Sequence, residues 1–274
     1  MDRRLTAANT RVAAAALKGL VEAERYVEGE AACVSVAVVD LCSAPAGARD
    51  RQLLLGARVV VYERQAGWAY VQAAKDGYVG YLPEEALGPA FSPTHRVTAR
   101  ATHLYPEANF KTRERMALSH GTRLEVIGQE GRFAQTPLGF VPHHHLVTLD
   151  AREPPIDVAR RFLGTPYLWG GNSGSGIDCS GLVQAALWAA GVGCPGDSDL
   201  QETTIGAAVA LDDEVRPADL FFWKGHVAMA QDSQTLLHAT AHFMAVVEEP
   251  LAEALARIER DDSPLRSRRR IAGL

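Results

Sequence analysis

Two stretches of the chain repeat one order of glycines, apolar residues and a proline. The first is GARVVVYERQAGWAYVQAAKDGYVGYLPEEAL and the second is GTRLEVIGQEGRFAQTPLGFVPHHHL, and each begins with Gly-x-Arg before an apolar run. Each also contains Gly-aromatic-apolar-Pro-x-x-x-Leu, so residues 80–87 match residues 139–146. Short alternating runs separated by glycine-rich turns are typical of small β-barrels. The duplication predicts two such barrels, over residues 31–90 and 91–150.

Residues 1–30 are expected to form a separate helical segment. Leu17, Leu20 and Val21 have helical spacing. The basic start resembles a signal peptide, but Lys18 interrupts the Ala-rich run and acidic residues stand where a cleavage site is expected. No stretch approaches the ~18 consecutive apolar residues of a membrane span. The sequence therefore predicts an amphipathic N-terminal helix on a cytoplasmic protein.

The charge and cysteine content narrow the classes of partner and compartment. The formal net charge is -5, from 28 basic and 33 acidic residues that are mixed along the chain. We therefore expect neither nucleic acid nor membrane as a partner, and the RSRRR run at 266–270 is expected to be a solvated tail. Four cysteines are too few for a disulfide scaffold, although Cys33 with Cys42, or Cys179 with Cys194, could pair. A reduced compartment is the simpler interpretation.

The sequence pattern changes at Pro154. The segment IDVARRFLG has a helical apolar face and ends at Gly164, and a second helix is predicted over residues 179–190. The apolar segments ADLFFW, HVAMA, LLHAT and FMAVV follow in that order and are expected to be strands. Helices first and strands afterwards predict an α+β domain over residues 151–274 rather than a parallel sheet.

Cys179 lies at the predicted start of the second helix. Asp178 is the predicted N-cap, and an apolar stripe runs from Leu182 to Ala190 before Gly191 ends the helix. Free N–H groups and the helix dipole favour a negative charge in a first turn, and the thiolate is the reactive form of cysteine. Because most free cysteines are small buried hydrophobes, position alone leaves both roles open.

Histidines downstream supply the base that a nucleophile needs. His226 and His238 lie on consecutive predicted strands, and a hairpin folded symmetrically about Asp232 sets them directly opposite, with Cβ atoms ~5 Å apart. One imidazole can then orient the other, although a one-residue slip would separate them. His242 shares the face of His238 and is the second candidate. Consecutive strand residues point to opposite faces, so we expect a surface turn, not a metal site, at residues 143–145.

These segments resemble a known family. YLWGGNSGSGIDCSGLVQAAL, ADLFFW, HVAMAQD and LLHAT resemble the NlpC/P60 cell-wall cysteine peptidases, and the repeats resemble bacterial SH3-like (SH3b) domains. The resemblance implies a papain-like domain with Cys179 as nucleophile, His226 as general base and acid, and His238 as the orienting residue. It implies no metal or cofactor. Ala218 replaces a glycine that often precedes Asp-Leu-x-Phe-Phe in the family, away from these groups.

The resemblance also implies a substrate. The family hydrolyses the bond between the γ-carboxyl of D-glutamate and an L-diamino acid in peptidoglycan stem peptides, and some SH3b-bearing members require a free N-terminal L-alanine. In those members the positions of Asp178 and Ser198 hold the ammonium group, and those of Tyr78 and Asp50 contact the substrate from the first SH3b domain. Asp178 could instead be only a helix cap, and Tyr78 and Asp50 could be ordinary barrel residues.

Further residues are expected around the thiol. Tyr167 and Trp169 resemble the segment that approaches the cysteine, although both could be core aromatics. Ser180 lies beside Cys179 and is grouped with the substrate contacts, and the backbone N–H of Cys179 is expected to be an oxyanion donor. The resemblance thus implies a monomeric thiol peptidase of murein peptide recycling. The alternatives are an exported hydrolase of polymeric peptidoglycan, an amidase or acyltransferase with the same centre, and a non-catalytic SH3b wall-binding protein.

Overall fold

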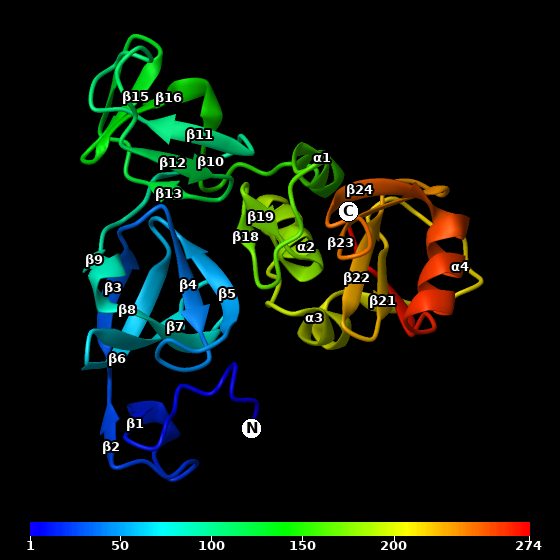
Figure 1. Cartoon of the computed structure of the whole chain (residues 1–274), viewed down its shortest axis with the longest axis horizontal. Helices are drawn as coiled ribbons and strands as arrows, with labels where there is room; N and C mark the ends of the chain where they lie inside the picture. The colour runs from blue at the N-terminus through cyan, green and yellow to red at the C-terminus, as the bar shows by residue number, and fades with distance from the viewer. The chain divides into compact units, whose positions relative to one another are not determined.

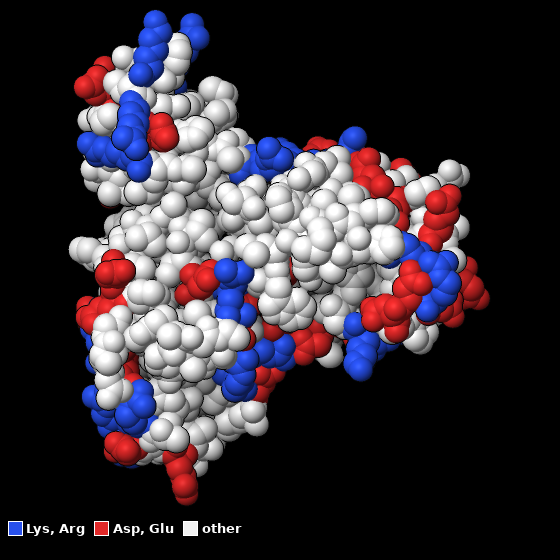
Figure 2. Space-filling model, in the orientation of Figure 1, with Lys and Arg blue, Asp and Glu red and all other residues white.

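The computed structural model describes residues 1–274, which divide into two compact units, Met1–Leu149 and Asp150–Leu274 (Figure 1). Each unit has hydrophobic cores of its own. Basic and acidic side chains are interspersed over the visible face of the molecule (Figure 2). None of the helices combines the length and the apolar character that a membrane span requires.

The prediction of a helix in the first 30 residues is wrong. Strand β1 (Val12–Ala14) pairs in parallel with β2 (Arg25–Val27), and between them lies the 3-10 turn η1 (Ala15–Leu17). Gly19 has a φ of 85°, which is incompatible with a continuing helix, and Leu20 is 63% exposed. A short helix in water depends on burying its apolar face against other elements. Leu17 packs against a small core, but Leu20 has no such cover, and an extended arrangement forms instead.

The first repeat lies in a seven-stranded sheet. Its order is β5-β4-β8-β7-β6-β3-β9, and all recorded pairs are antiparallel. The elements are β3 (Glu30–Val34), β4 (Val38–Cys42), β5 (Arg49–Leu54), β6 (Arg58–Gln65), β7 (Trp68–Ala73), β8 (Val79–Pro83), η2 (Glu84–Ala86) and β9 (Leu87–Pro89). The alternating residues of the repeat fill the core, as the sequence predicts.

The second repeat forms smaller sheets and has one strand more than the first. Its elements are β10 (His95–Val97), β11 (Ala101–Leu104), β12 (Met116–Ser119), β13 (Arg123–Leu124), β14 (Gly128–Glu130), β15 (Phe133–Thr136), β16 (Gly139–Pro142), η3 (His143–His145) and β17 (Leu146–Thr148). In both repeats the Gly-aromatic-apolar-Pro segment is a strand followed by a 3-10 turn and another strand. In these sheets no hydrogen-bonded pair of strands closes a barrel. The two closed barrels therefore stay a prediction.

The second unit has four helices and a six-stranded sheet. The helices are α1 (Pro155–Arg161), α2 (Cys179–Ala189), α3 (Ser198–Thr204) and α4 (Leu251–Asp261). The strands are β18 (Asn172–Ser173) and β19 (Gly176–Ile177), which pair with each other, and β20 (Ala207–Val209), β21 (Leu220–Trp223), β22 (His226–Ala230), β23 (Thr235–Thr240), β24 (Ala245–Pro250) and β25 (Ser267–Arg270) in the sheet. The predicted helices at α1 and α2 and the strands β21 to β24 are confirmed, and the antiparallel sheet confirms the α+β class.

The sheet of the second unit is covered on both faces. One core joins residues of α1 and α2 to alternate residues of the strands, and a second core joins the opposite residues to α4. Figure 1 shows the sheet between α2 and α4. Two faces that are both covered explain why the strand sequences are nearly continuous apolar runs.

The basic run near the C-terminus is not the solvated tail that its charge predicts. Strand β25 lies between β20 and β21 in the sheet, and Arg268 is 1% exposed. Asp219, which is fully buried, accepts hydrogen bonds from Arg270 at 2.7 Å to each carboxylate oxygen and lies 3.8 Å from Nε of Arg268. Arg268 and Arg270 are two residues apart on β25, so both side chains lie on one face of the strand and reach the same buried carboxylate.

Candidate functional site

Helix α2 begins as the sequence predicts. The Oδ1 atom of Asp178 accepts a hydrogen bond from the backbone N–H of Gly181 at 2.6 Å and from the hydroxyl of Ser180 at 3.0 Å. The Oδ2 atom accepts the backbone N–H of Gly170 at 2.9 Å. Asp178 therefore caps the helix and also fixes the glycine-rich loop before it, so the predicted N-cap is confirmed. This geometry holds Cys179 in the first turn.

The thiol of Cys179 is buried at the start of β22. Its sulfur accepts hydrogen bonds from the backbone N–H groups of Val227, Ser180 and Cys179 itself, and these contacts lower the thiol pKa. Burial, and then the charge of Asp178, act against them and raise the pKa of Cys179 to about 12. The net direction is opposite to the thiolate stabilisation expected from the helix start, because an anion loses its hydration when it is buried. The resting cysteine is a neutral thiol.

The two histidines contact each other, but not in the predicted register. Strand β22 pairs with β23 so that Met229 lies opposite Leu237 and Ala230 opposite Leu236, which shifts the expected register by two residues. His226 and His238 are therefore diagonal neighbours rather than direct partners. A shift of two keeps both side chains on one face, whereas a shift of one would have separated them. Nε2 of His226 lies 2.9 Å from Nδ1 of His238.

Two residues that the sequence analysis missed extend this contact. Nε2 of His238 lies 2.7 Å from Oε1 of Glu249, and Arg257 donates to the same carboxylate at 2.5 Å to Oε1 and 3.3 Å to Oε2. Glu249 follows Val247 by two residues on β24, and Val247 pairs with His238, so the carboxylate lies on the face of the histidines. Finding it requires the register of β23 with β24, which no motif in the sequence supplies.

His226 is a neutral imidazole in this environment. Burial, followed by electrostatic interactions with His238 and Arg257, lowers its pKa to about 3, while Glu249 acts in the opposite direction. A neutral imidazole has one nitrogen that accepts a proton and one that donates. His226 can therefore accept a proton from a neighbouring acid. The sulfur of Cys179 is hydrogen-bonded to the backbone N–H of Val227, which follows His226 on β22.

The expected residues around the thiol differ in their placement. Burial and then the charges of Cys179 and Asp178 raise the pKa of Tyr167, so its phenol lies in the electrostatic environment of the thiol. Trp169 is 68% exposed and is not a core aromatic. Ser198 is the first residue of α3, and this helix is tied to the start of α2 by Gln201, whose amide donates to the backbone carbonyl of Ser180 at 2.9 Å.

Two residues of the first repeat that are expected to contact the substrate, Tyr78 and Asp50, lie in the unit Met1–Leu149. Tyr78 is buried in the core of its own sheet, and the guanidinium of Arg51 lies 5.5 Å from the centre of its ring. Asp50 accepts two hydrogen bonds from Arg3, at 2.8 and 2.9 Å. Both residues therefore have structural partners within Met1–Leu149, and their contacts with a substrate stay a prediction.

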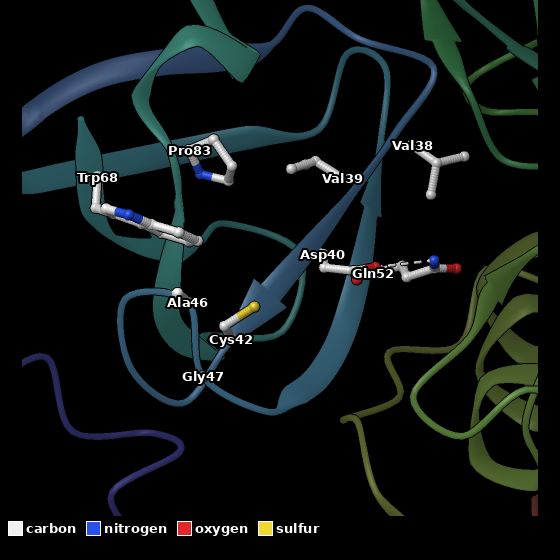
Figure 3. A pocket seen from close by; sticks show the side chains of 9 residues that line it. All are labelled: Val38, Val39, Asp40, Cys42, Ala46, Gly47, Gln52, Trp68 and Pro83. Carbon is white, nitrogen blue, oxygen red and sulfur yellow. Dashed lines mark hydrogen bonds between the residues drawn. The ribbon is translucent and has the colours of Figure 1, made fainter.

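An open pocket of about 530 Å³ lies in the first repeat, and none of the residues that line it is a predicted site residue. Figure 3 shows Trp68 and Pro83 on one side of it and the hydrogen-bonded pair Asp40 and Gln52 on the other. Asp40 also forms an ion pair with Arg49 at 2.7 Å. The charged group of the pocket is thus engaged with neighbouring side chains.

The remaining histidines and cysteines form no further centre. His242 is exposed in the turn after β23, so His238 rather than His242 is the partner of His226. The three histidines of η3 form the expected surface turn, and no group of three or more metal-ligating side chains is assembled in the structure. All four cysteines are free, so neither of the considered disulfides is formed.

Comparison with known families places both parts of the chain. The model of the NlpC/P60 family matches residues 164–256, and a model described as a bacterial dipeptidyl-peptidase Sh3 domain matches residues 41–87. The first match contains Cys179, His226, His238 and Glu249. The second ends at the close of the first repeat.

Similar proteins and one solved structure cover most of the chain. A gamma-D-glutamyl-L-lysine dipeptidyl-peptidase of Bacillus subtilis is 32% identical over 216 residues, which are 69% of this chain and 71% of that protein. The protein of the same name from Bacillus cereus is 27% identical over 226 residues, covering 69% of this chain and 67% of the relative. A crystal structure of an NlpC/P60 family protein from Bacillus cereus has a TM-score of 0.73 at 22% identity, over 88% of this chain and 99% of that one.

Proposed function

The chain belongs to the NlpC/P60 family of peptidases, and on that premise we propose that it is a cysteine peptidase in which Cys179 is the nucleophile, His226 the general base and acid, and His238 the residue that orients His226. The observation that carries the proposal is the contact of the two imidazoles at 2.9 Å beside a helix-start thiol that is bonded to the N–H of Val227. A nucleophile, a base and an orienting group are the three parts that such chemistry requires.

The proposed substrate is a peptidoglycan stem peptide cut between the γ-carboxyl of D-glutamate and an L-diamino acid, L-lysine or meso-diaminopimelate. The names of the two Bacillus relatives support a γ-D-glutamyl-L-lysine bond. The peptidase family and the Sh3-domain match are consistent with this class. We place the reaction in murein peptide recycling, in the cytoplasm, and we expect a monomer.

In the proposed reaction the thiol of Cys179 gives its proton to the neutral imidazole of His226 as the sulfur attacks the substrate. The sulfur attacks the γ-carbonyl carbon, and the backbone N–H of Cys179 stabilises the resulting oxyanion. The imidazolium gives its proton to the nitrogen of the diamino acid as the C–N bond breaks and a thioester remains. His226 then takes a proton from water, the hydroxide adds to the thioester, and the C–S bond breaks to release the γ-carboxylic acid and restore the thiol.

A free N-terminal L-alanine is the finer part of the proposal. Asp178 and Ser198 are the residues proposed to hold its ammonium group. The carboxylate of Asp178 caps α2, and a carboxylate attracts an ammonium group strongly when the two are desolvated together. Tyr78 and Asp50, and SH3-like barrels formed by the two repeats, are proposed to limit access to short peptides. Tyr167, Trp169 and Ser180 are proposed to line the cleft around the thiol.

The specificity is tested with L-Ala-γ-D-Glu-L-Lys and its meso-diaminopimelate analogue beside their N-acetylated forms, with products identified by mass spectrometry. The proposal predicts release of the diamino acid from the free-amine peptides alone. Equal cleavage of the N-acetylated peptides would refute the ammonium site, and cleavage of polymeric peptidoglycan would favour a wall hydrolase. If no γ-D-glutamyl bond is cut, the substrate assignment is wrong.

A further inference from the structure

Four side chains form a continuous polar line across the sheet and onto α4. The line runs from His226 on β22 to His238 on β23, then to Glu249 on β24 and Arg257 on α4, with contacts of 2.9, 2.7 and 2.5 Å. Figure 1 shows these strands in sequence, with α4 beside them. His226 and His238 belong to the proposed catalytic centre. Glu249 and Arg257 take no part in the reaction proposed above.

The chemistry of the carboxylate determines where the protons lie along this line. An ionised carboxylate only accepts hydrogen bonds, so Nε2 of His238 must carry the proton that faces Glu249. In the tautomer of His238 that has this single ring proton, Nδ1 is the acceptor, and Nε2 of His226 must be the donor across the 2.9 Å contact. The remaining nitrogen of His226, Nδ1, is left with its lone pair.

We infer that Glu249, held by Arg257, is a positioning residue that fixes the tautomers of both histidines and leaves Nδ1 of His226 as the proton acceptor for Cys179. The inference rests on the proposed function, since the tautomer of His226 affects turnover only if His226 is the base. Without the carboxylate, His238 can place its proton on Nδ1 and donate to His226. His226 would then carry its own proton on Nδ1, where it cannot take one from the thiol.

Arg257 keeps Glu249 in the form that this arrangement needs. Burial acts to raise the pKa of Glu249, but hydrogen bonds from His238 and Arg257 outweigh it and lower the pKa below its ordinary value. The side chains of Glu249 and Arg257 are 11% and 14% exposed, so water screens the pair only weakly. The guanidinium also lies 5.5 Å from the ring centre of Phe243, a distance at which the ring attracts the cation.

The same line stabilises the charge that forms during the reaction. When His226 accepts the thiol proton it becomes an imidazolium, whose Nε2–H faces the acceptor nitrogen of His238. The negative charge of Glu249 lies one imidazole ring away, in a partly buried position. Charge in a site of low dielectric acts over such a separation more strongly than it does in water. Loss of the carboxylate is therefore expected to affect the chemical step more than substrate binding.

The test combines tautomer spectroscopy with kinetics on the full chain. Two-bond ¹H–¹⁵N spectra of ¹⁵N-histidine-labelled protein identify the protonated nitrogen of each ring, in wild type, Glu249→Gln and Glu249→Leu. Steady-state kinetics on the γ-D-glutamyl peptide give kcat and KM for the same proteins. The matched control is Glu248→Gln, because Glu248 is exposed, pairs with Arg160 at 3.0 Å and lies on the opposite face of β24.

In wild type we expect protons on Nε2 of His238 and Nε2 of His226. Both Glu249 variants should show mixed tautomers and a kcat lower by on the order of ten- to a hundredfold, with KM within about twofold of wild type. Arg257→Lys, which keeps a cation near Glu249, should lose less, and Glu248→Gln should behave as wild type. A proton on Nδ1 of His238 in wild type, or unchanged tautomers and kcat in both Glu249 variants, would overturn the inference. A wild type that cuts no γ-D-glutamyl peptide refutes the proposed function, whereas the spectra still decide the tautomers.

Discussion

At Cys179, two physical effects act on one thiol in opposite directions. Backbone N–H groups at the start of α2 and at Val227 favour the anion, whereas burial and Asp178 disfavour it, and the second pair prevails. The helix start is visible in the sequence, but the depth of burial is not, because it depends on how α2 packs against the sheet. In the proposed reaction, a neutral thiol and a neutral His226 therefore predict that proton transfer accompanies attack rather than precedes it.

The raised thiol pKa predicts the absence of a resting thiolate. The ultraviolet thiolate absorbance of wild type minus that of Cys179→Ala should stay flat between about pH 5 and about pH 9. The subtraction removes the contribution of the other three cysteines, all of which are free and buried. A titration step in the difference spectrum below about pH 8 would instead indicate a thiolate–imidazolium pair at rest.

The lowered pKa of His226 predicts acid sensitivity. The pKa of His226 in the folded protein is about 3, whereas the ordinary pKa of a histidine is 6.5. Between these values the unfolded chain binds a proton that the folded protein does not, so lowering the pH favours unfolding. The free energy of unfolding should therefore fall below pH 6.5 more steeply in wild type than in His226→Gln, by up to about 1.4 kcal/mol per pH unit. Equal slopes in urea titrations between about pH 6 and about pH 5 would contradict this.

At the scale of elements, the sequence correctly predicts that His226 and His238 are in contact, but it predicts the wrong strand register. The turn position is close enough to predict one shared face, but the actual register differs by two residues. Side-chain direction repeats every two residues, so an even error preserves the contact and changes only the pairing. Glu249 requires a second register, between β23 and β24, and so it could not be predicted in the same way.

The cap of α2 gives a prediction about stability. Asp178→Ala removes the acceptor for Gly181 and leaves the N–H of Gly170 without this partner, so the free energy of unfolding should fall by about 2 kcal/mol. Asp178→Asn retains one acceptor oxygen, so its free energy of unfolding should fall by less. Urea denaturation followed by circular dichroism measures both. Equal stability of Asp178→Ala and wild type would show that the cap contributes nothing.

Strand β25 gives a second prediction at this scale. Asp219→Ala leaves the buried guanidinium of Arg268 without its carboxylate, and breaking a buried pair in this way costs about 3–5 kcal/mol. Arg260→Ala is the matched control, because its ion pair with Asp261 is exposed and should not measurably affect unfolding. Denaturant titrations measure the free energy of unfolding of both variants. A similar result for both would mean that the buried cluster does not stabilise the sheet.

At the scale of the whole molecule, the sequence predicts the repeats and the change of fold near Asp150 but not the form of the N-terminal segment. The duplicated glycine and proline positions specify local turns, so the matching element orders follow from residues close together in the chain. The first 30 residues carry a helical pattern whose outcome depends on tertiary cover, and β1 and β2 form instead. The basic strand β25 was missed because its partner Asp219 lies 51 residues from Arg270 in the chain.

The central claim is that Cys179 cuts a γ-D-glutamyl bond. Its most direct test is hydrolysis of L-Ala-γ-D-Glu-L-Lys by wild type, Cys179→Ala and Cys194→Ala, with released lysine quantified by mass spectrometry. Cys194 is also buried in the second unit and has no proposed part in the reaction, so it controls for the loss of a buried thiol. We predict that Cys179→Ala loses activity on the order of a thousandfold or more, while Cys194→Ala retains it. Lysine release by Cys179→Ala at the wild-type rate would contradict the account.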